Sequence, residues 1–214
     1  MKDKPILSAL CHYDRLIDLD NDPFWDEGAL REYMDGWDGD AFIRFVSGAK
    51  RGRALEIGVG TGRMAARTAK YFERLAGIDI SEKSVARARK NLEYIGNIEL
   101  ICGDFLAHSF SERFDCIYST LTFMHIEDKA RAVEKAAALL MPGGIFVLSL
   151  DKGRDEWIDM GKWKTRVFPD DPVRMKTLME TNGLIVKEIF ETERAYILTG
   201  VMEAPFNFQN RYAV

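Results

Sequence analysis

Apolar residues follow two different patterns along the chain, with a change near residue 51. From there onward, short apolar runs rich in Val, Ile, Leu and Phe alternate with longer segments in which apolar residues recur every three or four positions. The first pattern is typical of buried strands and the second of amphipathic helices. Their alternation predicts an α/β fold in which helices cover a mostly parallel sheet.

Seven apolar runs are predicted strands: 54–59, 75–80, 98–102, 114–119, 145–150, 184–190 and 195–201. Helices are expected between them, at about 62–73, 81–94, 128–140 and 171–183. Only a few polar residues separate the last two strands, which is hairpin spacing and requires an antiparallel pair. We therefore expect a parallel sheet that contains one reversed strand.

The segment 1–50 contains no strand-like run, and its apolar residues near 6–17 and 41–46 indicate short amphipathic helices. We expect it to form a helical cap on the core at 51–214. A polar stretch at about 151–171 is predicted to be an insertion after the fifth strand. A length of 214 residues suits a single domain that includes all of these parts.

Composition narrows the classes of function. With 47% hydrophobic and 11% aromatic residues the chain has material for a packed core, and no apolar run reaches the length of a membrane-spanning helix. The cysteines, Cys11, Cys102 and Cys116, form no CxxC pair, which fits a reducing compartment. We expect a soluble cytoplasmic protein without a membrane partner.

The net charge of −4 comes from the N-terminal segment, where residues 1–50 hold eleven acidic and six basic side chains. A nucleic-acid partner would require the opposite sign, so we expect none. Asp18, Asp20 and Asp22 have the alternate spacing of a calcium loop, but Pro23 and Ala29 occupy its required glycine and glutamate positions. No metal site is therefore predicted, and the acidic residues are expected to cap short helices in solvent.

The sharpest motif is LEIGVGTGRMA at 55–65, in which a buried strand runs into closely spaced glycines and a helix follows at once. Such a turn lets the backbone approach a ligand, and the helix N-terminus offers free N–H donors. The loop lacks the Lys-Ser/Thr of a phosphate-binding P-loop. Arg63 stands where the dinucleotide fingerprint has its third glycine, which weakens an interpretation as an NAD site.

Acidic residues follow the next two strands, as a nucleoside ligand would require. Asp79 ends the second strand, and a carboxylate there can accept both ribose hydroxyls. Asp104 follows the third strand beside Phe105, a pair that could recognise the exocyclic amine and the ring of adenine. A solvated strand-end Asp79 and a turn-forming Asp104 are the alternatives.

The segments LEIGVGTG, GIDIS, CGDF, FDCIYSTLTFMHI and LMPGGIFVLSL occur in this order. Together they resemble the successive motifs of the class I S-adenosylmethionine-dependent methyltransferases, over roughly residues 51–201. The resemblance implies a Rossmann-like three-layer α/β sandwich, with a seven-stranded, mostly parallel sheet and one antiparallel strand from the C-terminal hairpin. The N-terminal helical cap is added to this core.

The resemblance also implies residue roles. Glu56 and the loop glycines Gly58, Gly60 and Gly62 would meet the amino-acid portion of the cofactor, although Glu56 is longer than the Asp common at its position. Asp79 would hold the ribose, with Ile80 packed near the adenine. Asp104 and Phe105 would recognise the adenine. Ser119, at the end of the fourth strand, would lie beside the transferred methyl group.

Residues on the acceptor side carry weaker signals. His125 follows the fourth strand and is the best candidate for a general base, with a structural role as the alternative. Tyr13, Trp157 and Trp163 are candidates for lid or acceptor contacts. The N-terminal cap and the insertion at about 151–171, which contain them, would both lie over the carboxyl edge of the sheet. The tryptophans could equally hold the cap to the core.

The sequence thus predicts an enzyme that transfers a methyl group from S-adenosylmethionine to a small-molecule acceptor and releases S-adenosylhomocysteine. The acidity of the N-terminal segment would favour a neutral or cationic acceptor over a phosphorylated one. Two alternatives stay open: an NAD(P)-dependent oxidoreductase and a non-catalytic S-adenosylmethionine-binding module.

Overall fold

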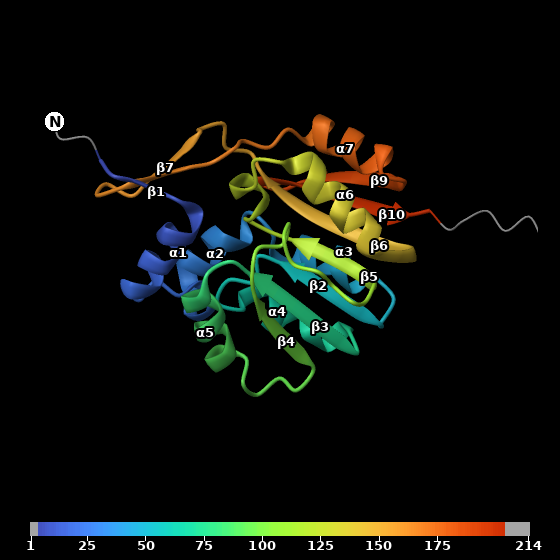
Figure 1. The fold of residues 1–214 in the computed structure, drawn as a ribbon, viewed down its shortest axis with the longest axis horizontal. Coiled ribbons are helices and arrows are strands. Elements are labelled where there is room, and N and C mark those ends of the chain that lie inside the picture. Colours follow the sequence, from blue (N-terminus) through green and yellow to red (C-terminus); the bar gives the residue numbers. More distant parts are fainter. Residues whose placement is uncertain (1–3, 204–214) are drawn as a thin grey trace, which may run out of the picture.

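The computed structural model describes residues 4–203, and its centre is a seven-stranded sheet of order β4-β3-β2-β5-β6-β10-β9 (Figure 1). The strands are β2 Arg53–Ile57, β3 Arg74–Asp79, β4 Ile98–Cys102, β5 Phe114–Ser119, β6 Leu140–Asp151, β9 Leu184–Glu191 and β10 Ala195–Met202. β4, β3, β2, β5 and β6 are parallel, whereas β10 is antiparallel to both β6 and β9. The expected parallel sheet with one reversed strand is confirmed.

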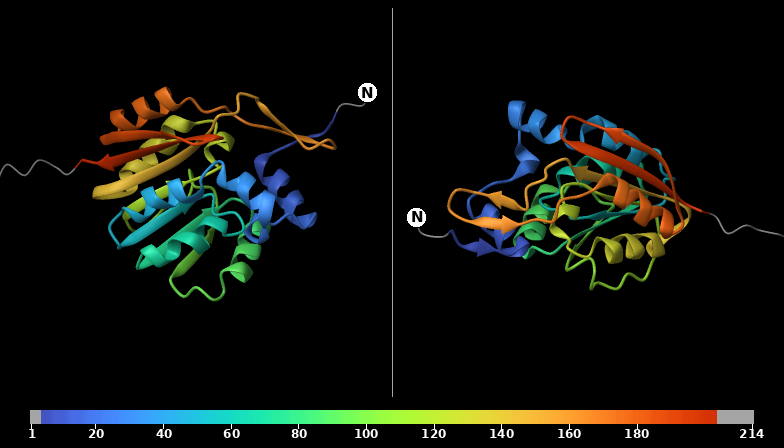
Figure 2. Two further views of the ribbon diagram at one scale, coloured as in Figure 1. Left: turned by 180° about the vertical axis from the view of Figure 1, so that it is seen from behind. Right: turned by 90° about the horizontal axis from the view of Figure 1, so that it is seen from above.

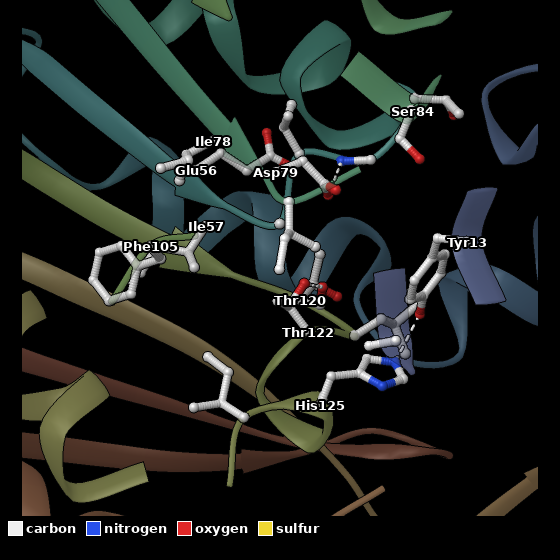
Figure 3. Close-up of a pocket in the computed structure, with 18 of the residues that line it drawn as sticks. Tyr13, Glu56, Ile57, Ile78, Asp79, Ser84, Phe105, Thr120, Thr122 and His125 are labelled. Carbon is white, nitrogen blue, oxygen red and sulfur yellow. Dashed lines mark hydrogen bonds between the residues drawn. The ribbon is translucent and has the colours of Figure 1, made fainter. Parts of the chain in front are cut away.

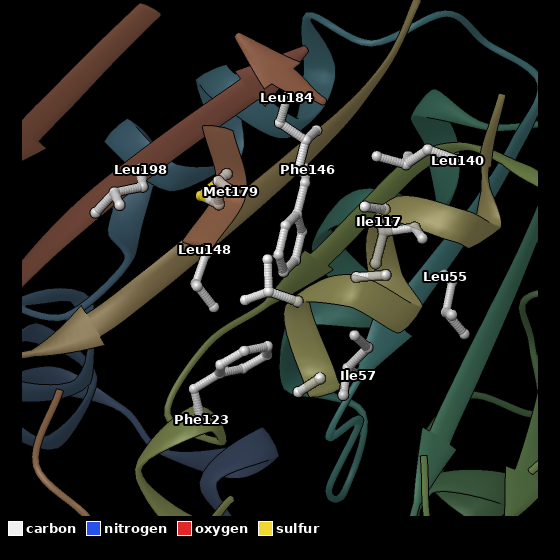
Figure 4. Close-up of a cluster of buried hydrophobic side chains, with 14 of the residues drawn as sticks. Leu55, Ile57, Ile117, Phe123, Leu140, Phe146, Leu148, Met179, Leu184 and Leu198 are labelled. Atoms are coloured by element: carbon white, nitrogen blue, oxygen red, sulfur yellow. The ribbon is translucent and has the colours of Figure 1, made fainter. Parts of the chain in front are cut away.

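Helices cover both faces of this sheet because each strand carries apolar side chains on both sides. One face packs against α6 Lys129–Leu139 and α7 Pro172–Thr181, and Met179, Leu148 and Phe146 lie in that layer (Figure 4). The other face packs against α3 Gly39–Ser47, α4 Arg63–Thr68 and α5 Glu82–Asn91. The result is the expected three-layer α/β sandwich.

The cap contains more elements than the apolar pattern predicted. The structure has α1 Ala9–Asp18, a 3₁₀ turn η1 Pro23–Trp25, α2 Gly28–Asp35 and α3. Ile6 and Leu7 form a short strand, β1, that pairs in parallel with β8 Lys164–Arg166. The prediction that residues 1–50 hold no strand was therefore wrong. A strand of two residues leaves no periodic signal, and its partner lies more than 150 residues away.

The insertion after β6 also forms strands. β8 pairs antiparallel with β7 Trp157–Asp159, and with β1 they make a three-stranded sheet separate from the central one. This arm extends beyond the body of the molecule, with β1 alongside (Figures 1 and 2). The insertion thus reaches back to the start of the chain and ties the cap to the second half of the fold.

The acidic residues of the cap face basic residues on α4 and α5. The ion pairs are Asp18–Lys83 at 2.6 Å, Asp22–Arg87 at 3.2 Å, Asp35–Arg67 at 2.8 Å, and Asp38–Arg63. Asp22 also caps η1, as expected, and Asp38 caps α3, but both side chains are buried and not in solvent. Most of this acidity is therefore matched within the molecule, and it attaches the cap to the core instead of marking an acceptor surface.

Candidate active site

A cavity of about 550 Å³ opens at the carboxyl ends of β2, β3 and β5 (Figure 3). It is lined by the loop after β2, by residues that follow β3, β4 and β5, and by one face of α1. Its size is that of a typical small-molecule site. Parallel strands bring their carboxyl ends to one edge, so residues far apart in the sequence meet there.

The glycine loop forms the floor of the cavity because its backbone takes left-handed conformations. The φ angles of Gly58, Gly60 and Gly62 are +79°, +54° and +96°, values that residues with a side chain rarely adopt. No atom lies within 4 Å of the position a Cβ would take at Gly60. The loop thus leaves open space where a ligand can approach the backbone.

Asp79, the last residue of β3, is held by two backbone donors. The N–H of Gly60 donates to its Oδ2 at 2.9 Å and the N–H of Ser81 donates to its Oδ1 at 2.9 Å. Burial raises the pKa of the Asp79 carboxyl, while these hydrogen bonds oppose the rise. The carboxylate therefore lines the cavity in a fixed orientation and connects the glycine loop to the next strand.

Glu56 lies under the loop, almost fully buried, and accepts a hydrogen bond from the Tyr118 hydroxyl at 3.0 Å. Tyr118 is in turn 2.6 Å from the hydroxyl of Thr68. Burial raises the pKa of Glu56 to about 8, because little water remains to solvate the charge. A cation that entered the cavity beside Glu56 would favour its ionised form.

Replacing Glu56 with glutamine should stabilise the ligand-free protein at neutral pH. A carboxyl pKa raised from 4.5 to about 8 makes the folded state keep a proton that the unfolded chain releases, so stability falls as pH rises through this window. We expect Glu56→Gln to increase the free energy of unfolding by roughly 2–4 kcal/mol at pH 7.5 and by little at pH 4.5. Denaturant unfolding at both pH values measures this, with exposed Glu188→Gln on β9 as the control. A variant no more stable than the parent at pH 7.5 would contradict the burial argument.

The residues predicted to meet a nucleoside base lie together on the β3–β4 side of the cavity. Ile80, Asp104 and Phe105 all line it. Ile80 is 46% exposed, so an apolar surface is open to a ligand. The Asp104 side chain accepts from the N–H of Leu106 at 2.8 Å, which fixes the turn, and the ring of Phe105 is 6% exposed.

Ser119 is not among the cavity-lining residues. It is fully buried, and its hydroxyl donates to the carbonyl oxygen of Ile57 at 2.8 Å, joining β5 to β2. The cavity wall here is made by the following residues, Thr120, Leu121 and Thr122. The predicted contact of Ser119 with a ligand therefore has no support from the geometry.

Tyr13 and His125 meet at the cavity wall, on α1 and on the 3₁₀ turn η3 Phe123–His125 (Figure 3). The Tyr13 hydroxyl is 2.8 Å from Nε2 of His125, and the rings pack edge to face. Burial lowers the pKa of His125 to about 4, so its imidazole is neutral at neutral pH. The structure brings together the predicted base candidate and one predicted lid residue.

The two predicted lid tryptophans do not line the cavity. Trp157 is 37% exposed on β7, with the Lys164 ammonium 4.4 Å from its ring. Trp163 is buried, and its indole N–H donates to Nδ1 of His12 at 3.0 Å. Of the two interpretations of the tryptophans, Trp163 fits the second: it holds the cap to the core, and through His12 it anchors the helix that carries Tyr13.

Replacing Trp163 with phenylalanine should destabilise the protein although it leaves an aromatic ring in place. The change leaves Nδ1 of buried His12 without its donor and leaves part of the indole volume empty. We expect a loss of about 1–3 kcal/mol in the free energy of unfolding. The matched variant Trp157→Phe, on the exposed strand, should change stability by less than about 0.5 kcal/mol. Equal thermal unfolding midpoints for the two variants would remove this role of Trp163.

Some cavity residues were not identified from the sequence. Ala9, Leu16 and Ile17 line the cavity on the same face of α1 as the predicted Tyr13, a spacing that the apolar pattern did contain. That face could have been assigned to the site. Thr120 donates to Asp38 at 3.0 Å, and no local pattern in the sequence indicates this link between the cap and β5.

The α1 helix spans the mouth of the cavity. Its Asp14 accepts from the Ser81 hydroxyl at 2.7 Å, beyond the end of β3, and Tyr13 contacts His125 beyond the end of β5. Asp18 pairs with Lys83 on α5. The helix is thus attached on both sides of the cavity.

Comparison with known proteins gives one family match and many similar folds. Residues 55–148 match the family model described as "Methyltransferase domain". Nodulation protein S of Sinorhizobium fredii is 29% identical over 109 residues, which are 49% of this chain and 50% of that protein. The chain spans about half the length of the curated relatives it matches.

Two solved structures illustrate the fold. The magnesium protoporphyrin IX methyltransferase of Synechocystis PCC 6803, with bound SAM, has a TM-score of 0.72 at 17% identity, with coverage of 90% of this chain and 96% of that chain. The N-methyltransferase NodS of Bradyrhizobium japonicum, in complex with S-adenosyl-L-homocysteine, has a TM-score of 0.67 at 21% identity, with coverage of 90% and 97%. At these identities the likeness shows the fold.

Proposed function

We propose that the chain is a class I S-adenosylmethionine-dependent methyltransferase that transfers a methyl group from S-adenosylmethionine to a small-molecule acceptor. The match of residues 55–148 to the methyltransferase-domain model and the shared fold support this. The observation that carries the proposal is the cavity, where Glu56, Asp79 and Asp104 lie around a glycine loop at the ends of adjacent strands. Carboxylates in these places match the positive and hydroxyl groups of that cofactor.

The residues present fit the cofactor in chemistry. Glu56 would pair with the ammonium of the amino-acid portion, whose positive charge would oppose the effect of burial and lower the pKa of the carboxyl. Asp79 would accept from the ribose hydroxyls, while Ile80, Asp104 and Phe105 would contact the adenine. The open space at Gly60 lets a ligand approach the loop without meeting a side chain.

When bound, S-adenosylmethionine supplies a methyl group on a positively charged sulfur, which needs no further activation. The contribution of this chain is then to align the acceptor and to keep water out. Tyr13, Leu16 and Ile17 on the lid helix α1 cover the cavity, and the contacts of α1 on both sides of the site hold it in place.

His125 is proposed to orient the acceptor through its contact with Tyr13. An imidazole whose pKa is about 4 is neutral at physiological pH and a weak base, so it suits hydrogen bonding better than proton removal. A separate role for metal is not proposed, since within residues 4–203 no three His, Cys, Asp or Glu side chains are grouped to hold an ion.

A cytoplasmic location and the absence of nucleic acid among the partners are also proposed. No helix within the described part of the chain is long and apolar enough to cross a membrane. Cys11, Cys102 and Cys116 are all free, which supports a cytoplasmic location. The acidic N-terminal segment supports the absence of nucleic acid among the partners.

Calorimetric titration with S-adenosylmethionine and with NADH tests the cofactor assignment. Binding of the sulfonium in the micromolar range and no response to NADH support the proposal; the reverse pattern would overturn it in favour of an oxidoreductase. A screen of metabolite acceptors, scored by release of S-adenosylhomocysteine, then separates an enzyme from a binding module. Binding without turnover on any acceptor would favour the module.

A further inference from the structure

The charged side chains that line the cavity are almost all acidic. The carboxylates are Glu56, Asp79, Asp104, Glu127 and Asp128. Within residues 4–203, the one Lys or Arg among the lining residues is Arg63. Its guanidinium donates to Asp38 through both terminal nitrogens and lies 3.8 Å from Asp35, so its charge is already matched.

Two of these acids have no part in the cofactor assignment. Glu127 and Asp128 follow His125 and Ile126 directly, and both are exposed at the rim of the cavity. Asp128 uses one oxygen to cap α6, where it accepts from the N–H of Arg131 at 3.0 Å. The wall near them is apolar, because Leu16, Ile17, Leu121 and Ile126 also line the cavity.

We infer that the acceptor is an amine on an apolar body, which Glu127 and Asp128 attract as the ammonium while the lid face of α1 and the turn after β5 contact the rest. The inference rests on the proposed function and names the substrate class of the same site. An anionic acceptor would meet several carboxylates and, among the described lining residues, no Lys or Arg other than the paired Arg63, which is unfavourable.

The chemistry of the transfer favours nitrogen for the same reason. The bound ammonium loses one proton to water, and the nitrogen lone pair forms the new N–C bond to the methyl carbon. The C–S bond breaks with its electron pair going to sulfur, and the positive charge then lies on nitrogen, near the acidic rim. A hydroxyl or carboxylate acceptor would instead bring a charged oxygen next to the carboxylates of Glu127 and Asp128, which repel it.

The pKa of His125 agrees with this assignment. A neutral imidazole with a pKa of about 4 draws a proton poorly from a hydroxyl group, whose own pKa is far higher. With Nε2 of His125 bonded to the Tyr13 hydroxyl, it is the Tyr13 hydroxyl that can still form a hydrogen bond with an amine in the cavity. A neutral amine needs no base at the moment of attack.

The test is equilibrium binding to the full chain saturated with S-adenosylhomocysteine. The probes are matched sets of amine, alcohol and carboxylate on one apolar body: 2-phenylethylamine, 2-phenylethanol and phenylacetate, and the corresponding hexyl set. We expect the amine to bind at least about tenfold more tightly than the carboxylate in at least one set, and its binding to weaken as salt is raised from low to high concentration. Equal or tighter binding of the carboxylate, or no amine binding at millimolar concentration, overturns the inference.

Variants of Glu127 and Asp128 test whether these two carboxylates cause the preference for amines. Glu127→Gln and Asp128→Asn keep the shape of each side chain, and asparagine still caps a helix. Each should weaken amine binding by about three- to tenfold and leave phenylethanol binding unchanged. The control Glu188→Gln, on exposed β9 away from the cavity, should leave amine binding unchanged. An unchanged amine affinity in both rim variants overturns their assigned role.

The same samples separate this inference from the proposed function. If S-adenosylhomocysteine binds and the amines do not, only the acceptor class fails. If S-adenosylhomocysteine itself does not bind, the cofactor assignment fails first.

Discussion

Replacing Asp79 with alanine is expected to abolish measurable binding of S-adenosylmethionine. The change removes the carboxylate proposed to hold the ribose, and it also leaves the N–H groups of Gly60 and Ser81 without their acceptor. The glycine loop then loses its link to the end of β3. We expect at least a 100-fold weaker affinity, or about 3 kcal/mol, in a calorimetric titration.

Asp104→Asn is the matched comparison for Asp79→Ala. Asp104 is exposed, and the asparagine oxygen can still accept from the N–H of Leu106. We expect its affinity to fall by no more than about tenfold, which is the effect of one weakened polar contact. Circular dichroism should show both variants folded. If the affinity of the Asp79→Ala protein for S-adenosylmethionine stays within threefold of the parent's, Asp79 does not hold the cofactor.

The grouping of the candidate cofactor residues around one cavity could be predicted because its signals are local. Glu56, Asp79 and Asp104 each stand at or just after a strand whose apolar run is visible in the sequence. Parallel strands then place these ends at one edge, so the rule that brings them together needs no long-range contact. The antiparallel strand β10 was equally visible, because a short polar turn joins it to β9.

Ser119 shows that this reasoning locates the end of a strand more surely than it identifies the residue that faces the cavity. Neighbouring side chains along a strand point to opposite sides, so a register error of one changes what a residue contacts. The Ser119 side chain bonds to β2, whereas Thr120 lines the cavity. The sequence identifies the end of β5 but does not say which residue there faces the ligand.

The acceptor side could not be predicted because its contacts join distant parts of the chain. Trp163 reaches His12 across 151 positions, and Thr120 reaches Asp38 across 82. The charge of the cap was interpreted through its net sign, whereas the partners of each carboxylate decide its effect. The acids that line the cavity belong to the core and not to the cap.

Replacing Gly58 with alanine should be among the most disruptive single changes in the loop. A Cβ at Gly58 would lie 2.7 Å from Cβ of Thr122 and closer still to its hydroxyl oxygen. The Thr122 side chain cannot move aside freely, because its hydroxyl donates to the carbonyl oxygen of Thr120 at 3.0 Å. With φ at +79°, the alanine is also strained in itself.

Gly60→Ala separates these two effects. Its φ of +54° brings similar backbone strain, but no atom lies within 4 Å of the added Cβ. Denaturant unfolding of the ligand-free protein should therefore show a loss of about 1–2 kcal/mol for Gly60→Ala and about 3–5 kcal/mol for Gly58→Ala. Adding Thr122→Gly to Gly58→Ala should recover part of the loss, since it removes the crowded side chain but not the backbone strain. Equal losses in the two single variants would mean that the contact with Thr122 does not constrain the loop, and that strain alone explains the glycine at position 58.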